Sequence, residues 1–281
     1  MRSYDPSWRA LLSPAAATDF FANGRPANEA ALCAELSRVA YIGFDRGEEG
    51  RRRASGILRN AGFAREQFIS AGGTECFVAR DIDAQLTVVA FRGTAGLRDV
   101  VTDLMAWRTR WGPGGKVHAG FARALRQIWP MLVPALGERD GRLIYTGHSL
   151  GAAVATLAAT LVPPAALYTF GSPRVGDARF VELLSEIRCI RKTGCSDVVC
   201  QVPPPWLGFE HSGRLTYLDR DGRSHIDPDP EMMREDQSSG RRAYVRRFAW
   251  GWGNAWSRRL ADHAPANYVS AVGSGSNINP G

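Results

Sequence analysis

The chain has 281 residues, of which 44% are hydrophobic and 22% charged, and its formal net charge is +7. This composition is that of a globular protein long enough to bury a sizeable core. A basic balance suits an anionic surface such as phospholipid or nucleic acid. Because no nucleic-acid-binding motif accompanies it, we expect no nucleic-acid partner.

The cysteines give no sign of a disulfide scaffold or a metal site. Five are present, with irregular spacing and no C-x-x-C pair, and the odd number leaves at least one thiol free. A bridge from Cys200 to Cys195 or to Cys189 stays open, although buried free thiols are the simpler interpretation. We predict no metal and no cofactor.

The chain shows no targeting or membrane-spanning segment. Residues 1–6 lack the charged-then-apolar order of a secretory signal. The uncharged run at 149–173 is long enough to span a bilayer, but Pro163 and Pro164 divide it into a helical half and a strand-like half. We therefore expect a protein that is cytoplasmic or exported by a signal-independent route.

The amino-terminal third predicts an arm, a helix and a group of strands. Residues 1–27 contain scattered prolines and read as an irregular arm, and residues 46–53 read as a charged loop. Asn28 is suited to cap a helix over 28–41. Alternating β-branched and aromatic residues predict strands, the first pairs antiparallel, at 67–69, 76–79 and 86–91.

Helix-like and strand-like segments then alternate. Helices are expected at 97–107, 117–136, 152–161 and 178–187, and strands at 142–146, 166–170 and 189–192. This order implies right-handed crossovers, and so a single α/β domain with a central, mostly parallel sheet flanked by helices.

The carboxy-terminal part predicts a late hairpin and a final helix. Strands are expected at 215–218 and 224–226, and a helix near residue 267. Residues 227–240 are acidic and polar and are expected to be mobile. Residues 241–259 mix arginines with tryptophans and match no motif, and residues 273–281 read as a flexible tail.

Residues 147–151 read G-H-S-L-G, the G-x-S-x-G pattern of a nucleophilic serine. The expected strand before it and helix after it would hold Ser149 on a sharp turn with its hydroxyl exposed. Such a serine needs an imidazole to remove its proton and a carboxylate to orient that imidazole. The alternative is an ordinary strand–turn–helix with a surface serine.

Chain order narrows the choice of partners, since the acid should follow the serine and the base should follow the acid. His263, just before the final helix, is favoured as the base over His225, in a charged hairpin, and over His211. Asp197 follows a strand of the expected sheet and is the favoured acid, because carboxyl ends of parallel strands converge. Asp177 also follows a strand but is more typical of a helix cap.

An oxyanion hole would complete the site. One donor is the backbone N–H of the residue after the nucleophile, here Leu150, and the other comes from a loop after an earlier strand. Thr94 lies in such a loop and offers both an N–H and a hydroxyl. It is also suited to cap the next helix.

Taken in order, these motifs resemble the class 3 lipases, the fungal-type triacylglycerol lipases of the α/β-hydrolase fold. The resemblance covers about residues 65–270 and rests on AFRGT at 90–94, VHAGF at 117–121, TGHSLG at 146–151, TFGSPRVG at 169–176, DV at 197–198 and DH at 262–263. It differs from the family where Val199-Cys200-Gln201 separates Asp197 from the expected proline.

The resemblance implies a cofactor-free serine hydrolase of lipid esters. In it Ser149 is the nucleophile, His263 the base and Asp197 the acid, with Thr94 and Leu150 in the oxyanion hole. One alternative is a phospholipase A-type enzyme that acts on membranes as an exported effector, and a second is a lipid-binding protein without activity. A peptidase is a more distant alternative. Nothing in the sequence sets the oligomeric state.

The resemblance further implies a short lid helix within residues 95–111, with substrate-facing residues Leu97, Val101, Leu104 and Trp107. Trp107 and Trp111 would suit contact with a lipid interface. The alternative is a helix docked permanently on the core. The segment 241–259 would be either an anchor for anionic lipid or a cap over the acyl site.

Overall fold

The computed structural model describes all residues except 1–3, 45–46, 94–106, 138, 140 and 275–281. The strands of its main sheet, in chain order, are β1 (Arg65–Ala71), β2 (Thr74–Asp81), β3 (Leu86–Phe91), β6 (Arg142–His148), β7 (Ala166–Phe170), β8 (Arg188–Gly194), β9 (Arg214–Leu218) and β10 (Ser224–Ile226). A two-stranded sheet is formed by β4 (Arg108–Arg110) and β5 (Lys116–His118).

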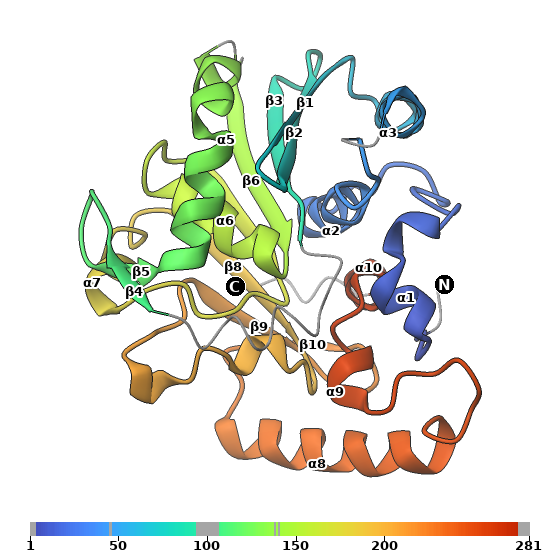
Figure 1. Cartoon of the computed structure of the whole chain (residues 1–281). Coiled ribbons are helices and arrows are strands. Elements are labelled where there is room, and N and C mark those ends of the chain that lie inside the picture. The colour runs from blue at the N-terminus through green and yellow to red at the C-terminus, as the bar shows by residue number, and fades with distance from the viewer. Residues whose placement is uncertain (1–3, 45–46, 94–106, 138, 140, 275–281) are drawn as a thin grey trace.

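The main sheet has eight strands in the order β1-β2-β3-β6-β7-β8-β9-β10 (Figure 1). Neighbours from β3 to β9 pair in parallel, whereas β1–β2, β2–β3 and β9–β10 pair antiparallel. The predicted α/β class and mostly parallel sheet are therefore confirmed, together with the early antiparallel pairs and the late hairpin.

Helices cover both faces of this sheet. The helices are α1 (Trp8–Leu12), α2 (Glu29–Val39), α3 (Glu48–Asn60), α5 (Ala119–Gly137), α6 (Leu150–Ala159), α7 (Ala178–Glu182), α8 (Pro230–Arg247), α9 (Arg258–Ala261) and α10 (Pro265–Ser274). Figure 1 shows α5 and α6 in front of one face, with α2 and α10 on the other side. Three-residue 3₁₀ turns lie at Pro14–Ala16, Val199–Gln201 and Pro205–Leu207.

The core consists of two apolar clusters, one on each face of the sheet. Along β3 the side chains alternate, because successive residues of a strand point to opposite faces. Val89 and Phe91 join the cluster under α5 and α6. Val88 and Ala90 join the cluster under α2 and α10. A strand buried on both faces explains the uninterrupted apolar run in the sequence.

Two helices replace segments expected to lack structure. Of the segment 46–53, expected to be a charged loop, residues 48–53 form the first half of α3, which buries only Ala54, Ser55 and Leu58. Residues 227–240, expected to be mobile, mostly belong to α8, where Asp229 caps the first turn and Pro230 occupies its first position. Both expectations are wrong because each helix has a narrow buried face and an otherwise polar surface.

Smaller differences concern the ends of the chain and the cysteines. The arm at 1–27 contains α1 and one 3₁₀ turn, and the expected helix at 178–187 is regular only to Glu182. All five cysteines are buried free thiols, so neither bridge that the sequence left open is formed. No helix in the described ranges is long and apolar enough to cross a membrane.

The turn from β6 to α6 needs two glycines at its contact point. A Cβ on Gly147 would lie 2.3 Å from the carbonyl carbon of Gly151, and a Cβ on Gly151 would lie 2.1 Å from the carbonyl oxygen of Phe91. Side chains at these positions would push α6 away from the sheet. The close approach of the helix to the strands therefore depends on glycine.

We predict that Gly147→Ala lowers the free energy of unfolding by about 1–3 kcal/mol, the usual cost of overpacking. Gly56→Ala is the matched control, since Gly56 lies in α3 and a Cβ added there would meet nothing within 4 Å. It should raise the stability by about 0.5–1 kcal/mol, because alanine is the better helix former. Urea unfolding measures both changes, and a Gly147→Ala protein as stable as the parent would contradict the packing argument.

Candidate active site

Ser149 lies at the sharp turn between β6 and α6. Its backbone has φ 60° and ψ −128°, a conformation that costs a residue with a Cβ roughly 1–3 kcal/mol. The turn is held from both sides, because the Ser149 N–H donates to the Phe170 carbonyl at 3.0 Å and the Ser149 carbonyl accepts from Ala152 N–H at 3.0 Å. Ser149 is buried, with 1% of the residue exposed, so the expected exposed hydroxyl is wrong: the Oγ lies under the His263 imidazole.

His263 lies between α9 and α10 and meets this serine. Its Nε2 is 2.9 Å from the Ser149 Oγ, a hydrogen bond between residues 114 positions apart. The His263 N–H donates to the Leu260 carbonyl at 3.1 Å, which fixes the backbone of the short connection. The imidazole can accept the serine proton at this distance.

Asp197 follows β8 and orients the imidazole from its other side. Both carboxylate oxygens lie 2.9 Å from His263 Nδ1, and Oδ1 also accepts from the Val199 N–H at 2.8 Å. Burial by itself raises the pKa of this carboxyl, but His263 and the hydrogen bonds outweigh it and lower the pKa below its ordinary value. Asp197 is therefore held as a carboxylate.

Tyr268, on α10, supplies a further donor that the sequence did not reveal. Its hydroxyl donates to Asp197 Oδ2 at 2.5 Å and accepts from the Gly194 N–H at 2.9 Å. Burial, followed by the nearby Asp197 charge, raises the pKa of this phenol well above its ordinary value, so it stays protonated. Its position near His263, at the start of the final helix, is the one signal that would have pointed to it.

His148, the variable residue of the G-x-S-x-G pattern, packs beside the catalytic imidazole. Its ring centroid is 4.5 Å from that of His263, and its Nδ1 is 2.7 Å from the Tyr41 hydroxyl. Burial, and then the neighbouring His263, lower the pKa of His148 well below its ordinary value. A neutral His148 ring adds no positive charge beside the His263 imidazole.

A second aspartate clamps the acid and base segments together. Asp262 precedes His263, and its Oδ2 accepts from the N–H of Ser196, the residue before Asp197, at 2.8 Å. The same oxygen accepts from Arg258 Nε at 3.1 Å. The hydrogen bond from Ser196 to Asp262 joins the loop after β8, which carries Asp197, to the segment before α10, which carries His263. It therefore helps to fix the distance between Asp197 and His263.

The other candidates from the sequence lie elsewhere. His225 bonds to Asp219 Oδ2 at 2.8 Å in the late hairpin, and His211 Nε2 bonds to the Cys200 carbonyl at 2.9 Å. Asp177 is the cap of α7, since its carboxylate accepts from Phe180 N–H at 3.1 Å. The structure thus brings together only the favoured set, Ser149, Asp197 and His263.

The predicted oxyanion hole is described in part. Leu150 is the first residue of α6, and the leading N–H groups of a helix have no acceptor within that helix. Its N–H therefore lies at the positive end of the helix dipole, next in the chain to Ser149, and its role in the oxyanion hole stays a prediction. Thr94 lies outside the described residues.

The predicted lid also falls mainly outside the described residues, which exclude Leu97, Val101 and Leu104. Trp107 is described and is 88% exposed, immediately before β4. Trp111, expected at a lipid interface, is instead buried, and its Nε1 donates to Thr160 Oγ1 at 2.8 Å. That interface expectation is wrong for Trp111, and the lid itself stays a prediction.

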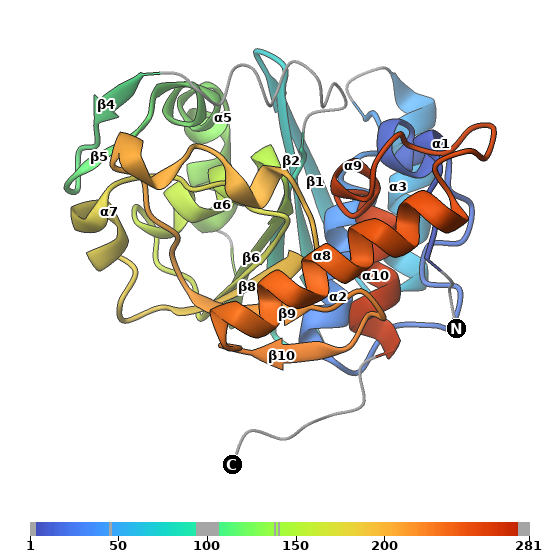
Figure 2. The same ribbon diagram turned by 90° about the horizontal axis from the view of Figure 1, so that it is seen from below.

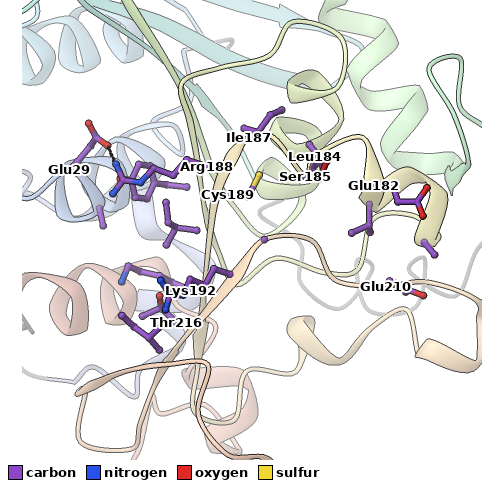
Figure 3. Close-up of a pocket in the computed structure, with 18 of the residues that line it drawn as sticks. Glu29, Glu182, Leu184, Ser185, Ile187, Arg188, Cys189, Lys192, Glu210 and Thr216 are labelled. Carbon is purple, nitrogen blue, oxygen red and sulfur yellow. Dashed lines mark hydrogen bonds and ion pairs between the residues drawn. The ribbon is translucent and has the colours of Figure 1, made fainter. Parts of the chain in front are cut away.

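A separate cavity of about 1010 Å³ lies along the β8–β9 edge and the start of α2 (Figure 3). In it Lys192 lies beside Thr216, and Arg188 lies 3.8 Å from Glu29. Burial lowers the pKa of Lys192 to about 8. No triad residue lines this cavity. Within the described ranges, no cluster of three or more His, Cys, Asp or Glu side chains could hold a metal ion.

A serine, an imidazole and a carboxylate in hydrogen-bond series, at the carboxyl ends of parallel strands and in the chain order Ser–Asp–His, define a serine hydrolase site on an α/β-hydrolase fold. Residues 88–206 match the family model Lipase (class 3). This match covers 119 of the 281 residues, and over that range the chain is similar to the class 3 lipases.

Relatives and solved structures show the same similarity. The chain is 32% identical over 171 residues to a lipase of Rhizopus niveus, covering 54% of this chain and 43% of that protein. It is 32% identical over 167 residues to the secreted mono- and diacylglycerol lipase 1 of Fusarium solani, covering 52% and 48%. The lipase structure from Rhizopus microsporus var. chinensis superposes with a TM-score of 0.55 at 26% identity, over 74% of this chain and 80% of that one.

A plant phospholipase is similar over a shorter stretch. The chloroplastic phospholipase A(1) DAD1 of Arabidopsis thaliana is 31% identical over 148 residues, covering 41% of this chain and 33% of that protein. The chain thus spans less than half the length of these curated relatives. The family match includes Ser149 and Asp197 and ends before His263, which is placed by the geometry alone.

We predict that Tyr268→Phe lowers kcat about tenfold with little change in KM. The variant removes one hydrogen bond to the Asp197 carboxylate, and bonds to charged groups contribute about 1.5–3 kcal/mol. Tyr168→Phe is the matched control, because the hydroxyl of this buried tyrosine donates to Glu29 Oε2 at 2.6 Å, in a cavity that no triad residue lines. Steady-state kinetics on a soluble ester measures both. Equal losses in the two variants would show a general packing effect instead of a positioning role.

Proposed function

We propose that this chain is a cofactor-free serine carboxylic-ester hydrolase acting on lipid esters, an acylglycerol lipase or esterase. One observation carries the proposal: Ser149 Oγ lies 2.9 Å from His263 Nε2, and His263 Nδ1 lies 2.9 Å from the Asp197 carboxylate. The match of residues 88–206 to the class 3 lipase model supports the ester substrate.

The reaction proceeds through an acyl-enzyme. His263 Nε2 accepts the Ser149 hydroxyl proton as Oγ attacks the ester carbonyl, and the Asp197 carboxylate stabilises the imidazolium that forms. The Leu150 N–H, with Thr94 as the proposed second donor, binds the oxyanion of the tetrahedral intermediate. His263 then returns the proton to the leaving alcohol. A water molecule, activated by the same imidazole, releases the fatty acid and restores Ser149.

We predict that Ser149→Ala abolishes turnover of a p-nitrophenyl acyl ester, with a loss of about 10⁴-fold or more. The alanine removes the nucleophile and leaves the hydrogen-bonded turn in place, so the unfolding midpoint should change little. Initial rates and a urea unfolding curve on the same preparation measure both. Activity equal to the parent would contradict the proposed mechanism.

We also predict that His263→Ala is nearly inactive, whereas His225→Ala keeps the parental rate. Only the first imidazole contacts Ser149 Oγ, while the second bonds to Asp219 in the hairpin. The two variants remove the same group from two places in one chain, so each serves as the control for the other. The reverse pattern would overturn the assignment of the base.

A phospholipase A activity is the second candidate. The similarity to a phospholipase A(1) and the net charge of +7 favour it, since anionic membranes attract basic proteins. Hydrolysis of phosphatidylglycerol vesicles, compared with triacylglycerol emulsion and a soluble short-chain ester, separates the two. A lipid-binding protein without activity would hydrolyse none of the three.

A further inference from the structure

The loop between α8 and α9 presents large apolar side chains to solvent. Trp250 is 87% exposed, Trp252 is fully exposed and Trp256 is 67% exposed. Single exposed apolar residues are ordinary, but several exposed indoles within one short loop mark a surface that contacts another partner. Tryptophan in particular is enriched at the boundary between lipid and water.

This loop has a fixed backbone. The Gly253 carbonyl accepts from the Trp8 N–H at 2.8 Å, and the Ala255 N–H donates to the Pro6 carbonyl at 2.8 Å. From α8, the Tyr244 hydroxyl donates to the Ala255 carbonyl at 2.6 Å. The loop thus holds its tryptophans on a rigid support, which lowers the conformational entropy lost when they are inserted into a partner.

Arginines from the end of α8 adjoin these tryptophans. Arg241, Arg242, Arg246 and Arg247 are all exposed. Arg242 and Arg246 are one turn apart, where like charges repel each other, and Arg246 Nε donates to the Arg242 carbonyl at 3.4 Å. No acidic side chain in the described part of the chain forms an ion pair with any of the four.

Charge is segregated along α8. Its acidic residues, Glu231, Glu235 and Asp236, lie in the first half together with Arg234, and the other four arginines lie in the second half. Asp236 is engaged by the fold, because its Oδ2 accepts from Cys195 Sγ at 3.2 Å and from the Tyr217 hydroxyl at 2.8 Å. The acidic residues of the helix therefore do not neutralise its basic half. The Arg242 guanidinium donates to the neutral hydroxyls of Ser238 and Ser239, at 2.8 and 3.2 Å, which leaves its charge uncompensated.

The same contacts place α8 at the catalytic end of the sheet. Cys195 directly follows β8 and is two residues before Asp197, so α8 packs against the strand end that carries the proposed acid. Figure 1 shows α8 along this end of the molecule, and Figure 2 shows it crossing the face seen from below, with α9 close by. A surface bound to this helix would lie on the side of the sheet where the triad is.

We propose that the arginine–tryptophan patch, formed by Arg241, Arg242, Arg246, Arg247, Trp250, Trp252 and Trp256, docks the protein on an anionic phospholipid surface. The arginines bind lipid phosphates, and the indoles of the rigid loop enter the interfacial layer between them. A neutral lipid droplet would bury the tryptophan side chains but provide no anions for the arginines. A polyanion without an apolar layer would pair with the arginines but leave the tryptophans in water. Docking requires no active serine, so it stands apart from the proposed hydrolysis.

Vesicle co-sedimentation of the full chain carrying Ser149→Ala tests the docking without hydrolysis of the lipid. The protein should bind vesicles of phosphatidylcholine mixed with an equal part of phosphatidylglycerol, and bind pure phosphatidylcholine vesicles weakly. Added salt should weaken the binding, since the attraction to the anionic leaflet is screened. Trp250→Ala/Trp252→Ala and Arg242→Glu/Arg246→Glu should each reduce the affinity at least about tenfold.

Matched controls separate the patch from general charge and hydrophobicity. Trp206→Ala removes an indole that is 82% exposed in another part of the chain, and Arg52→Glu/Arg65→Glu reverses two exposed charges on α3 and β1. Both should bind like the parent. With Ser149 restored, the patch variants should hydrolyse a soluble short-chain ester at the parental rate, and their unfolding midpoints should be unchanged.

Three results would overturn the docking proposal. They are equal binding to neutral and mixed vesicles, parental binding by both patch variants, and binding to heparin with none to mixed vesicles. If the parent protein hydrolysed no ester, the proposed function would fail, but vesicle binding could still be measured, because the binding assay uses the Ser149→Ala protein.

Discussion

A carboxylate enclosed by the core is stable only when donors surround it, and Asp197 obtains its donors from distant parts of the chain. His263 and Tyr268 reach it from the carboxy-terminal segment, and the Val199 N–H reaches it from its own loop. Removing a charge from water is costly, and an unpaired buried carboxylate would be strongly destabilising. The packing of α10 against the sheet thus helps to keep Asp197 ionised, because Tyr268 of α10 donates to its carboxylate.

The serine turn imposes a second constraint on the same region. Ser149 keeps a strained backbone because Gly147 and Gly151 let α6 approach the sheet closely, and because Phe170 of the neighbouring strand accepts its N–H. The parallel order of β6, β7 and β8 then brings the serine and the connection after β8 to one end of the sheet. The clamp through Asp262 holds the His263 connection against that same loop.

Periodicity and motif order in the sequence were enough to predict the sheet and the positions of the serine, acid and base. Parallel strands end at a common edge, so residues that follow successive strands come together whatever the details of their loops. Tyr268 and the Tyr41–His148 pair were not predicted, because their contacts join residues 71 and 107 positions apart without a local signal. The helix α8 was missed because it buries only Gly240 and Tyr244.

Labelling with a fluorophosphonate tests the central claim most directly, since the reagent reacts with a serine whose proton is removed by a neighbouring imidazole. Mass spectrometry of the intact protein should show one adduct per chain, and peptide mapping should place it on Ser149. Ser149→Ala and His263→Ala proteins should remain unlabelled under the same conditions. A folded parent that forms no adduct, or one labelled at a different residue, would contradict the assignment of the triad.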